Sequence, residues 1–247
     1  MRSHHLSRAR RLSSRPADLP DCCARRFLDP CDDNEDCQWV DDPNMYMTTR
    51  RWYPTLETLP DGSAIIVRLL LCLLSLSRDP LTTFFLGQIG GCEWGGYVNG
   101  ANQNNPTYEF YPPKGDGKPV TMNVLLNSLP ANLFSLTWLL PSGNLFIQTN
   151  WATEIFDFNN NIEYQLDDIP NAVRTYPASG ATAMLPLTPA NNWTATLLFC
   201  GGTDLKADQW TTTWNIAGYA ADDTCVKVRP SRLAPAPLSC LVGDAPG

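Results

Sequence analysis

The chain has 247 residues, of which 43% are apolar and 17% charged, with 21 Pro and 16 Gly. This composition favours many short strands joined by turns and argues against long surface helices. The net charge of −7 is unevenly distributed, because residues 1–26 hold seven Arg and two acids while the remainder holds 11 basic and 23 acidic groups. An acidic body repels phosphates, so we expect no nucleic-acid partner.

The first 30 residues form a basic leader without the apolar stretch of a secretory signal peptide. Their Ser and Arg content resembles an organellar transit peptide, but the favoured interpretation is an unstructured or wrongly annotated start. Histidine occurs only at His4 and His5, both in this leader, which argues against a zinc site in the body. The nine Cys favour an oxidising compartment.

Regular strand patterns begin after Arg51. Asp61-Gly62 is a tight-turn signal, and residues 64–67 (Ala-Ile-Ile-Val) read as a buried strand. Residues 137–140 and 145–148 are apolar and flank Pro-Ser-Gly-Asn, which predicts a strand, a turn and a second strand.

The pattern continues towards the C-terminus. Residues 154–158 predict a strand that ends in the turn signal Asn-Asn-Asn, and residues 181–185 and 197–200 predict two more. The last of these ends on Gly201-Gly202. Recurrent strands, Gly turns and paired glycines are typical of a kelch-type blade, so the expected fold is all-β, an incomplete kelch-type β-propeller. A plain β-sandwich is the alternative.

Residues 68–89 interrupt this pattern of strands and turns. They are Leu-rich, but the apolar run is shorter than the ~18–20 residues that a membrane helix needs, so no membrane association is expected. If Val67 were joined to Gly90-Gly91, the strand before the insert would end on paired glycines, as residues 197–202 do. We therefore interpret the insert as a translated intron. The Val-Arg dipeptide that opens it recurs at the start of a Pro-rich tail, residues 229–247.

Arg51-Trp52-Tyr53-Pro54, followed by a Gly turn and an apolar strand, resembles the tyrosine-bearing blade of glyoxal oxidases. The resemblance covers residues 31–67 and 90–228 as one propeller portion, and four further stretches carry it: 108–113, 128–133, 168–171 and 200–202. It implies the N-terminal part of a seven-bladed propeller, with three blades recognisable here. It also implies an extracellular copper radical enzyme, related to galactose oxidase, that oxidises aldehydes to carboxylic acids and reduces O2 to H2O2.

By this resemblance, Tyr53 is the copper ligand and radical centre, joined to a Cys through a thioether. A phenol has a pKa of about 10, so Cu(II) must hold it as phenolate. An ordinary half-buried strand aromatic is the alternative for Tyr53. Trp94 lies close to where a related enzyme stacks an indole on the modified tyrosine, although a core or loop-anchoring Trp is the favoured interpretation.

The other copper ligands of the family have no match in these residues. The thioether Cys belongs to an earlier blade, and the second Tyr with its His and a final His belong to later parts. We therefore expect this chain by itself to be inactive and to hold no copper. A non-catalytic kelch-like interaction module is the alternative, and a gene-model artefact of a full oxidase is a third reading that explains leader, insert and tail together.

Four cysteines resemble two disulfide pairs of the family, Cys31 with Cys37 and Cys200 with Cys225. The triplet Asn192-Trp193-Thr194 is a candidate N-glycosylation sequon, whereas Asn105-Pro106-Thr107 is excluded by its proline. Both features fit an oxidising, extracellular location.

Overall fold

The structure is a computed structural model, and it describes residues 47–48, 54–67, 105–206, 209 and 218–230, together with the backbone of three short strands nearer the N-terminus. Those strands, β1 (His5–Leu6), β2 (Arg26–Leu28) and β3 (Trp39–Asp41), form a small antiparallel sheet. Two of these strands, β1 and β2, lie within the basic leader.

Three larger antiparallel sheets follow in chain order, each a meander in which every strand pairs with the next. The first is β4 (Thr55–Thr58), β5 (Ala64–Val67), β6 (Thr107–Tyr111) and β7 (Val120–Thr121). The second is β8 (Leu136–Leu139), β9 (Leu145–Thr149), β10 (Ala152–Asp157) and β11 (Ile162–Gln165). The third is β12 (Ala181–Met184), β13 (Leu197–Cys200) and β14 (Cys225–Val228).

The turns lie where the sequence predicts them. Gly62 and Gly143 have φ angles of 79° and 82°, which place them in the left-handed region of the β4–β5 and β8–β9 turns. Asn161, with φ of 54°, ends the predicted Asn turn between β10 and β11. The predicted strand at residues 64–67 is β5, and the predicted strand–turn–strand unit is β8 and β9.

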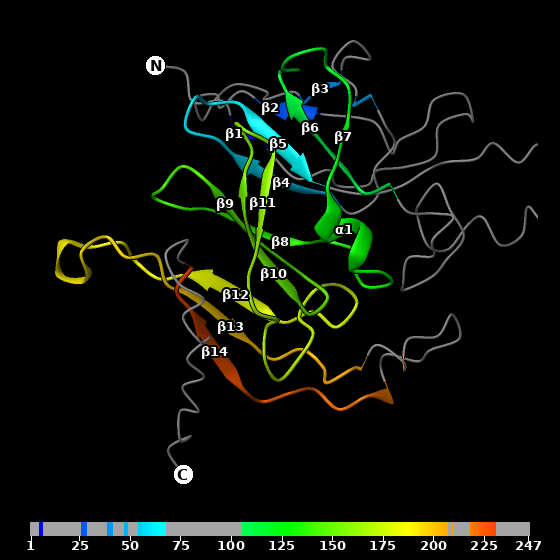
Figure 1. The fold of residues 1–247 in the computed structure, drawn as a ribbon, viewed down its shortest axis with the longest axis vertical. Coiled ribbons are helices and arrows are strands. Elements are labelled where there is room, and N and C mark those ends of the chain that lie inside the picture. Colours follow the sequence, from blue (N-terminus) through cyan, green and yellow to red (C-terminus); the bar gives the residue numbers. More distant parts are fainter. Residues whose placement is uncertain are drawn as a thin grey trace, which may run out of the picture.

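The three sheets stack face to face, as Figure 1 shows with β4–β7 above, β8–β11 in the middle and β12–β14 below. The middle sheet is covered on both faces, and every side chain of β9 is buried. A β-sandwich has two sheets, whereas successive four-stranded meanders stacked in chain order are typical of propeller blades. The described chain is thus all-β, with one α-helix, and is consistent with an incomplete β-propeller.

Two hydrophobic clusters hold the stack together. Between the first and second sheets, Tyr108 packs edge-on against Phe156 with ring centroids 5.1 Å apart. Between the second and third sheets, Phe146 packs against Phe199 with centroids 6.1 Å apart. Alternation along β9 and β10 sends Phe146 to one side and Phe156 to the other, so one sheet supplies both cores.

The helix α1 (Asn123–Asn127) lies against β10 and β11 beside the first core. Val124 and Leu125 are its buried residues. In the part of the chain that the structure describes, neither this helix nor any other is long and apolar enough to cross a membrane.

The paired glycines after β13 allow a close approach between two backbone segments. Gly201 and Gly202 have φ angles of 73° and 95°. A Cβ on Gly202 would lie 2.2 Å from the carbonyl oxygen of Val173, so only glycine allows these backbones to approach. Val173 and Thr203 exchange backbone hydrogen bonds of 2.9 and 3.0 Å at this point. The contact fixes the segment that leads into β12.

Candidate functional site

Tyr53, the candidate ligand and radical tyrosine, lies outside the described residues, as do Trp94, Cys31 and Cys37. The description resumes at Pro54, which is half-buried and directly precedes β4. We therefore describe the start of β4, which directly follows the candidate tyrosine in sequence, and the residues that contact it.

The start of β8 lies beside the start of β4. The Thr55 hydroxyl donates a 2.5 Å hydrogen bond to the backbone carbonyl of Ser135, one residue before β8. Further along the same pair of strands, the Glu57 carboxylate accepts a hydrogen bond from the backbone N–H of Leu139. Side chains of β4 thus link the first strands of two successive sheets.

The segment that leads into β12 joins the same place. Leu133 and Tyr176 form an antiparallel β-bridge. The Thr175 hydroxyl donates a 3.1 Å hydrogen bond to the carbonyl of Ala131. We call residues 54–55, 131–135 and 174–177 the entrance segments, since each leads into the first strand of one large sheet and hydrogen bonds connect all three.

Two of the entrance segments share a sequence motif, of which only the first copy is named above. Arg51-Trp52-Tyr53-Pro54 leads into β4, and Arg174-Thr175-Tyr176-Pro177 leads into β12. The pattern Arg-x-Tyr-Pro therefore precedes the first strand of two sheets in the sequence, directly before β4 and four residues before the start of β12. A search for internal repeats would have singled out Tyr176 beside Tyr53.

Arg174 fixes the third entrance segment. Its side chain is 1% exposed, and its Nη1 donates 3.0 Å hydrogen bonds to the carbonyls of Pro170 and Ala172. Gly180 and Gly202 leave room for it, because a Cβ at either would lie 2.8 or 2.9 Å from its aliphatic carbons. This buried guanidinium satisfies loop carbonyls and so acts as a scaffold for Tyr176.

A second buried charged side chain anchors the chain ahead of Tyr53. Glu109 on β6 is 2% exposed, and its Oε2 accepts 2.9 Å hydrogen bonds from both the backbone N–H and the hydroxyl of Thr48. Thr48 precedes Tyr53 by five residues, and Thr55 follows it by two. Two anchored positions therefore flank the candidate tyrosine in sequence.

Two glutamates have strongly perturbed acidities. Burial raises the pKa of Glu57 to about 7, against the opposing effect of the N–H groups of Leu139 and Thr58. Burial, together with the charge of the adjacent Glu163 and a hydrogen bond to it, raises the pKa of Glu154 on β10 to about 9. At neutral pH, Glu154 therefore holds a proton, beside the half-buried Glu163.

Glu163 on β11 in turn caps the helix α1. Its two oxygens each accept a 2.8 Å hydrogen bond, one from the backbone N–H of Asn123 and one from that of Val124. The carboxylate thus satisfies two donors at the first turn of the helix. This arrangement gives the two acids a structural role, because Glu163 ties α1 to the middle sheet and Glu154 is hydrogen-bonded to Glu163.

The donor groups within the described ranges do not fit a copper ion. No group of three or more His, Cys, Asp or Glu side chains comes together among these residues. A Cu(II) centre prefers imidazole and oxygen ligands in tetragonal geometry. The described residues therefore supply no copper ligand set.

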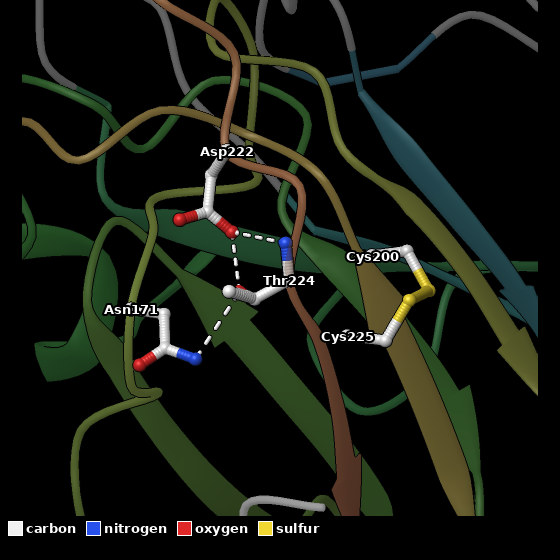
Figure 2. The surroundings of a disulfide bond; sticks show 5 residues. All are labelled: Asn171, Cys200, Asp222, Thr224 and Cys225. Carbon is white, nitrogen blue, oxygen red and sulfur yellow. Dashed lines mark hydrogen bonds between the residues drawn. A yellow bond between two sulfur atoms is a disulfide. The ribbon is translucent and has the colours of Figure 1, made fainter. Parts of the chain in front are cut away.

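The predicted pair Cys200 and Cys225 forms a disulfide, with an S–S distance of 2.08 Å. The two residues lie directly opposite one another on β13 and β14. Figure 2 shows the bond beside a polar network in which Asp222 accepts from the backbone N–H and hydroxyl of Thr224. Asn171 donates a 3.1 Å hydrogen bond to the same hydroxyl and so connects β14 to the loop before β12.

Comparison with known proteins finds one matching family model, described as glyoxal oxidase N-terminus, over residues 97–237. An aldehyde oxidase GLOX from Vitis pseudoreticulata is 29% identical over 187 residues, which cover 74% of this chain and 29% of that protein. Aldehyde oxidase GLOX1 from Arabidopsis thaliana is 29% identical over 188 residues, 72% of this chain and 24% of its own length. A WSC domain-containing protein from Arthroderma benhamiae is 28% identical over 203 residues, 78% and 17% respectively. The chain thus spans less than a third of each relative.

Proposed function

Because the chain belongs to the glyoxal oxidase N-terminus family, matched over residues 97–237, we propose that it supplies the tyrosine-bearing part of the propeller of an extracellular aldehyde oxidase. The whole enzyme would convert aldehydes to carboxylic acids and reduce O2 to H2O2 at a copper centre. Tyr53 would be the residue of this chain that touches the metal. The names of two plant relatives, both aldehyde oxidases, support the substrate class.

The observation that carries the proposal is the meeting of the entrance segments. Thr55, two residues after Tyr53, is bonded to Ser135, and Leu133 is bridged to Tyr176. A redox centre shared by several blades needs the first strands of those blades to start at one place. Preorganised donors on rigid strands hold such a site more precisely than isolated loops do.

In this proposal the 247 residues alone do not turn over aldehydes. Their only histidines are His4 and His5, and the described residues contain no cluster of metal-binding side chains. The same observation favours the second candidate, a kelch-like module that binds a partner and performs no chemistry. The two candidates differ in whether Tyr53 has a chemical role.

A chimera separates them. The 187 aligned residues of the Vitis relative are replaced by those of this chain, without residues 68–89, and aldehyde oxidation is followed as peroxide release from glyoxal or methylglyoxal. The proposal predicts an active chimera whose activity falls by at least about 1000-fold in Tyr53→Phe, since the phenol would be essential. Tyr164→Phe, at an exposed position of β11, is the matched control and should retain activity.

The outcome that would contradict the oxidase proposal is a folded chimera in which Tyr53→Phe leaves peroxide release unchanged. The 247-residue chain, loaded with copper and assayed in the same way, should release no more peroxide than its own Tyr53→Phe variant. Release above that control would overturn the expectation that the chain is inactive by itself.

A further inference from the structure

A twelve-residue loop, residues 185–196, joins β12 to β13 and projects from the stack. Figure 1 shows it in yellow, extending away from the three sheets at the end where β4 and β5 are also joined. The corresponding β4–β5 and β8–β9 connections are tight turns of five residues each. The loop is therefore an elaboration of the third sheet, at the end opposite the entrance segments.

The loop has a defined conformation. Thr188 and Asn191 form a reciprocal capping box around the short 3-10 helix Pro189–Asn191, with hydrogen bonds of 3.0 and 3.4 Å. The Asn191 side chain also donates a 2.9 Å hydrogen bond to the carbonyl of Pro186, and Trp193 N–H donates to Thr188 at 3.0 Å. Both the backbone and the side chain of Asn191 are thus hydrogen-bonded within the loop.

Asn192, the next residue, is different. It is exposed and left-handed, with φ of 52° and ψ of 38°, and only its backbone N–H is bonded, to Pro189. Thr194 is also exposed. Within the described part of the chain, neither the Asn192 amide nor the Thr194 hydroxyl forms a hydrogen bond. The two groups that define a glycosylation sequon are therefore both free and facing solvent.

The same sheet carries a second mark of the secretory pathway. Cys200, six residues after Thr194, is bonded to Cys225 across β13 and β14. Disulfides form and persist in oxidising compartments, which are also where sequons meet the glycosylation machinery. The disulfide is an observation independent of the sequon, and it indicates the same compartment, the secretory pathway.

We propose that Asn192 carries an N-linked glycan. The Asn192 Nδ2 attacks the anomeric carbon of a lipid diphosphate-linked oligosaccharide, forming the N–C bond as the C–O bond to the diphosphate breaks. The amide loses one proton and the lipid diphosphate leaves with the electron pair. The glycan would stand next to Trp193, whose side chain is 56% exposed, and would cover part of this apolar surface.

The inference depends on the secretory location in the proposed function and not on oxidase activity. The test expresses the full chain behind a cleavable secretory leader in eukaryotic cells and analyses both secreted and microsomal protein. Peptide N-glycosidase treatment in heavy-oxygen water is followed by peptide mass mapping. We expect conversion of Asn192 to a labelled Asp, complete loss of this signal in Thr194→Ala, and its retention in Thr194→Ser.

Asn191→Gln is the structural control, because it breaks the capping box but keeps the sequon and should remain glycosylated. Asn105, which is buried and followed by Pro106, is an internal negative control. Disulfide-bonded chain from the microsomes that lacks a glycan at Asn192 would overturn the inference. A glycosylated chain whose Tyr53 has no chemical role would leave it standing while removing the oxidase proposal.

Discussion

The Glu57 carboxylate on β4 accepts a hydrogen bond from the backbone N–H of Leu139 on β8, and so connects two sheets through a group with a pKa of about 7. These two strands belong to separate sheets and are not paired by a backbone ladder. A side chain that reaches across supplies the bond instead. In the described residues of β4, β5 and β8, no other charged side chain faces Glu57, and burial alone raises its pKa.

Glu57 should make the stability of the stack fall as pH rises. Its folded-state pKa lies above the ordinary value of 4.5, so its stabilising effect is complete below pH 4.5 and is lost as pH rises through about 7. Thermal melts should therefore show a lower Tm at pH 8 than at pH 5. Glu57→Gln, which still offers a carbonyl oxygen to Leu139, should reduce this difference by the equivalent of about 1–2 kcal/mol. An unchanged pH dependence in Glu57→Gln would contradict this role.

Glu154→Gln should stabilise the protein at neutral pH. The buried carboxyl has a folded-state pKa of about 9, so folding at pH 7–9 requires it to take up a proton that the unfolded chain has released. Gln is neutral at every pH and removes that cost, which predicts a gain of about 1–3 kcal/mol at pH 8 and little change at pH 4. Denaturant unfolding at the two pH values measures it.

Glu163→Gln is the matched control for Glu154. This variant loses the charged cap of Asn123 and Val124 and should be destabilised by about 1 kcal/mol at pH 8. Opposite signs for the two substitutions distinguish a protonated buried acid from a helix cap. Equal destabilisation by both would show that Glu154 is ionised in the folded protein.

The strand pattern could be predicted from sequence, because buried strands and Gly turns are local signals. Residues 64–67, 145–148 and 197–200 alternate or cluster apolar side chains between turn residues, and each is a strand. The buried glutamates could not be predicted. Glu57 and Glu154 occupy positions that read as polar faces, and their burial depends on a neighbouring sheet or helix that is remote in sequence.

The candidate site was predictable only in part. The Arg-x-Tyr-Pro motif indicated Tyr53, and its recurrence at Arg174 would have indicated Tyr176. The meeting of the entrance segments is a tertiary relationship between residues 80 positions apart, as for Thr55 and Ser135, and no local pattern encodes it. The disulfide of Cys200 and Cys225 was found by resemblance to a family, since spacing alone does not determine connectivity.

Gly202→Ala should be far more damaging than Gly143→Ala. Both glycines have left-handed backbones, so either substitution costs about 1–2 kcal/mol of strain. At Gly143 a Cβ meets nothing within 4 Å, whereas at Gly202 it would lie 2.2 Å from the Val173 carbonyl oxygen. We expect a further ~1–3 kcal/mol loss for Gly202→Ala, measured by denaturant unfolding. Equal losses for the two variants would contradict the close contact at Gly202.

Removing the disulfide should weaken the third sheet. The bond closes a loop with a sequence separation of 25, for which the chain-entropy model gives about 3 kcal/mol. Cys200→Ser with Cys225→Ser should lower the free energy of unfolding by about this amount. Non-reducing peptide mapping of the oxidised wild-type chain should recover the two cysteines in one linked peptide. Free thiols at both positions would contradict the pairing.

The most direct test of the central claim, that Tyr53 is the copper-binding radical tyrosine, is mass spectrometry of the chimera with the Vitis relative after copper loading. The account predicts a Tyr53-containing peptide crosslinked to a cysteine-containing peptide, with the loss of two hydrogens that a thioether requires. An unmodified Tyr53 peptide from a chimera that oxidises aldehydes would contradict it.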